Sequence, residues 1–185
     1  MEEVLHPSRR RTIVLIGMMG AGKTTTGFGL AQKLGIKFMD SDREMEKIEG
    51  MTMAEIFEKK EPAQFNEVEK NIIRKMLKTT KPQVLSIGGN AYDDPDIRRE
   101  IKEKTISVFV DVDLDILIKR VERRNNRPFL EGKDKARVMT DMYNEKYPIY
   151  STTDIVINTT YLSKDATINV IMQLISDYIN SYGKN

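Results

Sequence analysis

The residues with the clearest chemical meaning form a glycine-rich stretch, GMMGAGKT, at positions 17–24, directly after the apolar run at 12–16. They fit the pattern G-x-x-x-x-G-K-[ST], whose glycines let the backbone wrap an anion with its N–H groups pointing inward. In this pattern Lys23 neutralises phosphate charge, and the hydroxyl of Thr24 ligates Mg²⁺. The alternative is a chance glycine-rich turn, but the strand before it and the helix after it favour a site for a nucleoside triphosphate with Mg²⁺.

Two further groups of residues follow apolar runs. Asp40 and Asp42 come after the second run, and Gly88 and Gly89 come after the third. Beside a nucleotide, one carboxylate could support the metal with Thr24, while the other orients or deprotonates an acceptor hydroxyl. Two structural alternatives stay open. Asp42 would also suit a helix N-cap, and the paired glycines would also suit a tight turn instead of a surface on which a substrate packs.

The apolar runs that position these residues alternate with amphipathic patterns. We expect strands at 12–16, 37–39, 83–87, 105–110 and 155–157. We expect helices at 23–34, 43–48, 53–60, 63–79, 94–102, 113–122, 134–147 and 164–182. Such alternation predicts an α/β fold, with a parallel sheet covered by helices on both faces and ligands at the carboxyl ends of its strands.

One polar, basic segment between two helical patterns, 122–134, contains proline and glycine. It is either a solvated loop or a mobile lid that closes over the nucleotide and excludes water during transfer.

Composition limits the other possibilities. A chain of 185 residues is expected to form a single domain, with a flexible N-terminus over about 1–11 that includes the only histidine, His6. The net charge of +2 does not favour nucleic-acid binding, and the absence of cysteine excludes thiolate chemistry. No apolar run approaches the ~20 residues of a membrane span. We therefore expect a cytoplasmic monomer that acts on a small molecule, without a nucleic-acid or membrane partner.

These motifs, in this order, resemble the shikimate kinase family over about 12–159. The glycine-rich pattern at 17–25, the D-x-D at 40–42 and the lid motif Arg127-Pro128-Phe129-Leu130 carry the resemblance. The family implies a three-layer P-loop kinase fold with a five-stranded parallel sheet and a lid, and it implies ATP and Mg²⁺ as cofactors.

The resemblance also assigns roles. It makes Lys23, Asp42 and Arg127 catalytic, with Asp42 as the base and Arg127 stabilising the transferring phosphoryl group. Thr24 and Asp40 would support the metal, and Arg120 takes the place of an adenine-stacking arginine. The residues assigned to the nucleotide are Gly20, Ala21, Gly22, Lys23, Thr24, Thr25, Arg120 and Arg127. Those assigned to the acceptor are Asp42, Asn66, Gly88, Gly89 and Lys146.

Departures from the family pattern gather at the acceptor positions. Asn66 and Lys146 replace two arginines that grip the carboxylate of shikimate, Asn90 replaces a third glycine, and Glu61-Pro62 replaces Gly-Glu. An arginine fork matches a carboxylate with two parallel hydrogen bonds, which neither asparagine nor lysine reproduces. Losing one partner of a desolvated charge pair costs about 2–5 kcal/mol.

Three functions follow in order of preference. The first is phosphorylation of shikimate to shikimate 3-phosphate, with rearranged acceptor contacts. The second is phosphorylation of another small alcohol, which the departures favour. The third is nucleotide binding without turnover. The presence of Lys23, Asp42 and Arg127 argues against this function.

Overall fold

The computed structural model describes residues 11–123, 130 and 132–182. The described residues contain one five-stranded sheet in the order β2-β3-β1-β4-β5, and all its neighbouring strands are parallel. The strands are β1 (Thr12–Ile16), β2 (Lys37–Asp40), β3 (Gln83–Ser86), β4 (Thr105–Asp111) and β5 (Ile155–Asn158). Every residue of β3 and β4 is buried, as expected for strands that are covered on both faces.

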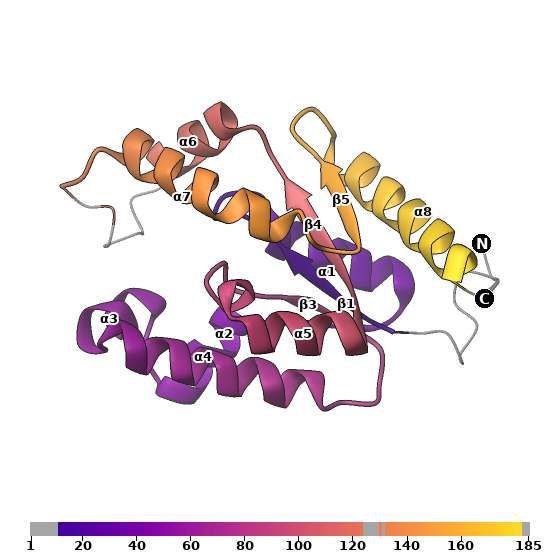
Figure 1. Cartoon of the computed structure of the whole chain (residues 1–185), viewed down its shortest axis with the longest axis horizontal. Coiled ribbons are helices and arrows are strands. Elements are labelled where there is room, and N and C mark those ends of the chain that lie inside the picture. Colours follow the sequence, from indigo (N-terminus) through magenta and orange to yellow (C-terminus); the bar gives the residue numbers. More distant parts are fainter. Residues whose placement is uncertain (1–10, 124–129, 131, 183–185) are drawn as a thin grey trace.

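Helices cover both faces of this sheet, with α1 behind it and α5 and α7 in front in Figure 1. Helix α8 packs beside α1, and α4 packs on both α2 and α5. The helices are α1 (Lys23–Leu34), α2 (Ser41–Glu49), α3 (Met53–Lys59), α4 (Pro62–Leu77), α5 (Pro95–Lys104), α6 (Leu114–Glu122), α7 (Lys135–Tyr150) and α8 (Lys164–Tyr182), with a 3₁₀ turn η3 (Ala91–Asp93). The three-layer architecture and the five-stranded parallel sheet are therefore as predicted.

Some boundaries differ from the prediction for identifiable reasons. Helix α2 begins at Ser41, and the N-cap is Asp40, whose carboxylate accepts from the backbone N–H of Asp42 at 3.1 Å. The interpretation of Asp42 as an N-cap was therefore wrong, and its side chain lies in the first turn of the helix. Helix α7 continues through Pro148 to Tyr150, three residues beyond the predicted end. The turn η3 carries too few residues to show a period and was not predicted.

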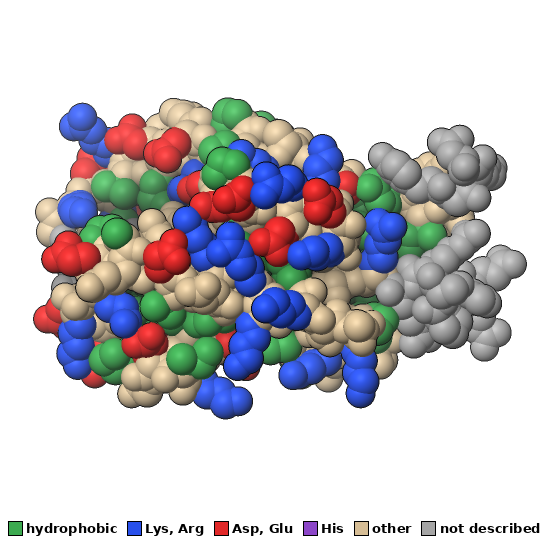
Figure 2. Space-filling model, turned by 60° about the horizontal axis from the view of Figure 1, so that its bottom comes forward, with side chains coloured by type: hydrophobic (Ala, Val, Ile, Leu, Met, Phe, Trp, Pro, Cys, Tyr) green, Lys and Arg blue, Asp and Glu red, His purple; other side chains and the backbone are tan. Residues whose placement is uncertain are grey.

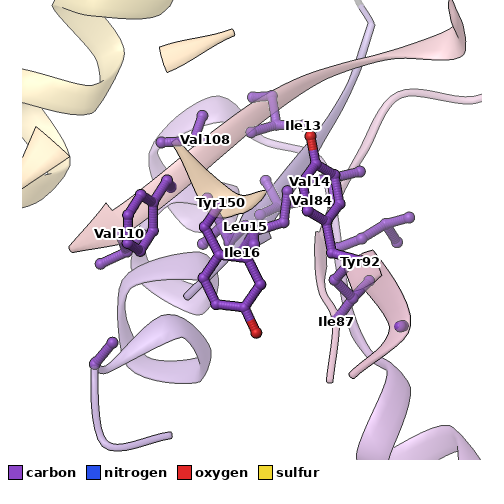
Figure 3. Packing of buried hydrophobic residues seen from close by; sticks show 14 of the residues in the cluster. Ile13, Val14, Leu15, Ile16, Val84, Ile87, Tyr92, Val108, Val110 and Tyr150 are labelled. Carbon is purple, nitrogen blue, oxygen red and sulfur yellow. The ribbon is translucent and has the colours of Figure 1, made fainter. Parts of the chain in front are cut away.

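Two buried tyrosines join the front layer to the sheet. Figure 3 shows Tyr92, from η3, and Tyr150, from α7, among the strand residues of the core. The Tyr150 ring lies 6.2 Å from that of Tyr92 and 5.4 Å from that of Phe109 in β4, both in edge-to-face geometry. The end of α7 is thereby fixed against η3 and the sheet.

Ion pairs fix α4 against α5 on the outer side. Lys70 of α4 lies 2.6 Å from Asp94, the N-cap of α5, and Arg74 lies 3.0 Å from Glu100. Figure 2 shows acidic and basic side chains intermixed on this face. None of the helices in the described ranges is both long and apolar enough to cross a bilayer.

Candidate functional site

The glycine-rich loop lies between β1 and α1, at the carboxyl end of the central strand. Gly17 and Gly22 have φ angles of 155° and 92°, which residues with side chains rarely adopt. A Cβ on Gly17 would lie 2.6 Å from the carbonyl oxygen of Val110 in β4. Gly22 is the N-cap of α1 and has no side chain to bond the first N–H groups of the helix. These N–H groups are suited to hold an anion.

Two basic side chains contact this loop. The ammonium of Lys23 donates to the carbonyl oxygens of Gly17 and Met18, at 2.7 and 3.3 Å, so it lies folded along the loop. From α6, Arg120 donates to the carbonyl oxygen of Gly20 at 3.0 Å. The structure thus brings Arg120 to the nucleotide loop from 100 residues away in the sequence.

The candidate metal site joins α1 to the end of β2. The hydroxyl of Thr24 donates to Oδ2 of Asp40 at 2.8 Å, and Asp40 is 7% exposed. Hydroxyl and carboxylate oxygens are hard ligands, and Mg²⁺ usually binds one or two protein oxygens while phosphates and water complete its shell. Within the described ranges no group of three or more acidic or histidine side chains is arranged to hold a metal ion by itself, so Thr24 and Asp40 fit Mg²⁺ beside a nucleotide better than an all-protein metal cage.

The acceptor side is built around Gly88. A Cβ on this residue would lie 2.0 Å from Oε1 of Glu69 and 3.2 Å from Oδ1 of Asp42, so both carboxylates occupy the space that a side chain would fill. The N–H of Gly88 donates to the hydroxyl of Ser41 at 2.9 Å. The carbonyl of Gly89 accepts from the hydroxyl of Tyr150 at 2.6 Å. The paired glycines are therefore more than a tight turn, because they allow the close approach of α2, α4 and α7.

Glu69 is the most buried acid of this group, with 2% exposure. Burial, and then the nearby Asp42 and Asp93, raise the pKa of Glu69 to about 8, while Lys146 and Lys23 act in the opposite direction. Burial disfavours the charged carboxylate, and neighbouring carboxylates add repulsion. The site therefore contains three acids, of which Asp42 and Asp93 both lie within electrostatic reach of Glu69.

Lys146, on α7, is 5% exposed, and its ammonium pairs with Oδ2 of Asp93. Asn66 lies one helical turn before Glu69 on α4 and is exposed. The structure thus brings Asp42, Gly88, Gly89 and Lys146 together, whereas Asn66 lies on the exposed side of this group. Arg127 lies outside the described residues, together with the rest of 124–129 and position 131 of the predicted lid. Of the lid motif only Leu130 is described, and it is buried.

The sequence analysis missed Asp93. This residue follows Gly88 and Gly89 by a few positions, after the same strand end, and a search extended past the glycines would have included it. The N-terminal region over 1–11, except Arg11, also lies outside the described residues.

The parallel sheet, the loop before α1 and the Thr24–Asp40 contact define a P-loop kinase fold. The family model for shikimate kinase matches residues 19–176, and the chain belongs to this family.

Individual relatives agree with this assignment. The chain is 40% identical to a shikimate kinase of Caulobacter vibrioides, over 84% of this chain and 77% of that protein. It is 36% identical to one of Brucella canis, over 91% and 84% of the two chains. Among solved structures, shikimate kinase from Acinetobacter baumannii in complex with shikimate matches with a TM-score of 0.87 and 30% identity, covering 96% of this chain and 98% of that one.

Proposed function

We propose that the protein transfers the γ-phosphoryl group of ATP to a ring hydroxyl of shikimate and forms shikimate 3-phosphate. The observation that carries this proposal is the placement of Asp42. Its carboxylate lies beside Gly88, two residues after Asp40, which contacts Thr24 of the nucleotide loop. A candidate base thus lies between the candidate metal ligands, Thr24 and Asp40, and the turn at Gly88. The family membership, and the relative that was solved with shikimate, support the choice of acceptor.

Each residue has a defined part in this proposal. The first N–H groups of α1 and the ammonium of Lys23 hold the phosphates of ATP, and Arg120 lies where it would border the nucleotide. Thr24 and Asp40 would hold Mg²⁺, which when bound neutralises charge on the β- and γ-phosphates. Asp42 orients the acceptor hydroxyl and accepts its proton. Arg127 and the segment 122–134 are proposed to stabilise the transferring group and to exclude water.

The acceptor departures also favour a second candidate, a different small alcohol. Asn66 carries no charge, and Lys146 is paired within the protein. An acceptor without a carboxylate would not need the missing arginine forks.

The test is a coupled assay of ADP release with ATP, Mg²⁺ and shikimate, repeated with a panel of small cyclic alcohols and acids. Shikimate-dependent ADP release that disappears in Lys23→Ala, but not in Lys33→Ala at the exposed end of the same helix, supports the proposal. Release with another alcohol alone would favour the second candidate. ATP binding without release for any acceptor would indicate a nucleotide-binding protein without turnover.

A further inference from the structure

The pair between Lys146 and Asp93 closes one side of the acceptor site. Lys146 comes from α7, and Asp93 ends the turn η3 that follows Gly88 and Gly89. One helical turn after Lys146, the hydroxyl of Tyr150 donates to the carbonyl oxygen of Gly89. Two contacts therefore join the same helix to the same turn, and they fix the lysine toward a carboxylate of the protein itself.

Acids already balance this lysine. Glu69 lies within electrostatic reach of Lys146. Asp42 and Asp93 in turn lie within electrostatic reach of Glu69. The lysine lowers the pKa of Glu69 while both aspartates raise it. A carboxylate that an acceptor brought to Lys146 would be a further negative charge beside Asp93, and like charges repel strongly where water is excluded.

The other oxygen of Asp93 indicates which chemistry would be accepted instead. Oδ1 of Asp93 is buried and has no hydrogen-bond partner among the described residues, although the side chain as a whole is 27% exposed. A buried carboxylate oxygen without a partner is unfavourable, and a donor removes that cost. Hydroxyl, amide and ammonium groups donate hydrogen bonds, whereas an ionised carboxylate only accepts them.

We propose that Asp93 is a specificity-determining residue, which pairs with Lys146 in place of an acceptor carboxylate and so favours an acceptor that presents an uncharged hydrogen-bond donor there. The inference rests on the proposed function, because it concerns the acceptor site of the same reaction. Shikimate has to compete with Asp93 for the lysine, whereas an amide in place of its carboxylate has no such competition.

The experiment compares wild type with Asp93→Asn on two acceptors, shikimate and its carboxamide, in the ADP-release assay. Asparagine keeps the size and an oxygen that accepts from Lys146 but removes the charge. We expect the KM for shikimate to fall at least about tenfold, since releasing a buried cation from a competing carboxylate exceeds the 1.4 kcal/mol that one factor of ten requires. The KM for the carboxamide should remain the same or rise, and the KM for ATP should not change.

Asp96→Asn is the matched control. Asp96 lies three residues further along, its side chain is 58% exposed, and it pairs with Arg99 on the surface. The same charge is lost there without a change in the acceptor site, so the ratio of kcat/KM for shikimate to that for the carboxamide should remain as in wild type.

The inference is overturned if the ratio in Asp93→Asn does not rise, if it rises equally in Asp96→Asn, or if calorimetry shows that shikimate binds no more tightly. A higher KM for shikimate would show that Asp93 positions the lysine for the substrate. Asp93→Ala, checked by circular dichroism for folding, is the second variant if the asparagine protein does not fold. A different measurement tests the proposed function. That function would be contradicted if the wild-type protein showed no shikimate-dependent ADP release. Release that occurs only in Asp93→Asn would contradict the proposed function and support the inference.

Discussion

The nucleotide side and the acceptor side of the site differ in how they satisfy their charges. On the nucleotide side, Lys23 and Arg120 donate to backbone carbonyls, and Asp40 accepts from Thr24 and from backbone N–H groups. On the acceptor side, Lys146 pairs with Asp93, Asp42 and Asp93 act on the buried Glu69, and one oxygen of Asp93 has no hydrogen-bond partner among the described residues. The nucleotide side is defined by backbone geometry that any protein of this kind needs to bind a nucleoside triphosphate. The acceptor side is defined by side chains, and these depend on the acceptor.

The largest test of this division is Asp42→Asn, which removes the candidate base where the two sides meet. We expect kcat to fall by about 10²–10⁴-fold, the usual range for general acid–base catalysis, with ATP affinity unchanged. Asp165→Asn controls for the loss of an acid in the first turn of a helix, since Asp165 is exposed in the first turn of α8. Near-normal kcat in Asp42→Asn would remove the base from the mechanism.

Gly88→Ala tests the space between the acids. Its Cβ would meet Oε1 of the buried Glu69, which has little room to move, and overpacking of this kind costs about 1–3 kcal/mol. We expect a lower melting temperature and weaker acceptor binding, measured by calorimetry and by KM.

Combining Gly88→Ala with Glu69→Ala should restore part of the stability, because the clashing atom is then absent. If the two changes are additive, the close approach is not the cause.

Asn66→Arg tests whether the acceptor side lacks a cation. The new guanidinium would lie one turn from Glu69 and offer a fork to a carboxylate, so the KM for shikimate should fall by about tenfold, or about 1.4 kcal/mol. Asn71→Arg, also exposed on α4, is the control for added positive charge. An unchanged KM in Asn66→Arg, or an equal fall in both variants, would contradict the carboxylate argument.

The smallest expected effect is a change in the pH dependence of stability in Glu69→Gln. The folded protein holds the pKa of Glu69 at about 8, above its ordinary value of 4.5, with Asp42 on α2, Asp93 in η3, Lys146 on α7 and Lys23 on α1 as its charged neighbours. The unfolded chain loses this proton near pH 4.5, while the folded chain keeps it until about pH 8. The stability from this proton is thus complete below pH 4.5 and is lost as the pH rises toward 8.

Urea unfolding between pH 5 and 8 measures this effect. The free energy of unfolding should fall with pH more steeply in wild type than in Glu69→Gln, by at most about 1.4 kcal/mol per pH unit for one proton. Parallel curves would show that the lysines keep Glu69 ionised.

The fold and the glycine-rich loop between β1 and α1 were predicted from the sequence, for a physical reason. Strand and helix periods are local, and the glycines before Lys23 are required by a local backbone path. Arg120, by contrast, was assigned to the nucleotide only from the family resemblance, and its contact with Gly20 was not predicted. The pairing of Lys146 with Asp93 was not predicted, because it depends on how α7 packs on η3, and residues 53 positions apart leave no local pattern. The alternative that placed Asp42 at the N-cap was wrong, because Asp40 and Asp42 suit that position equally well by residue type and only the path of the chain decides between them.

The close approach of Glu69 to Gly88 has an evolutionary consequence. While position 69 carries this buried carboxylate, position 88 has no space for any side chain, and a side chain becomes possible there only after the acid is lost. The order of substitutions is therefore constrained, because the acid at position 69 has to be replaced before a side chain fits at position 88. A kinase with this scaffold that acquires a new acceptor can instead vary exposed positions near the pair, such as 66 and 90.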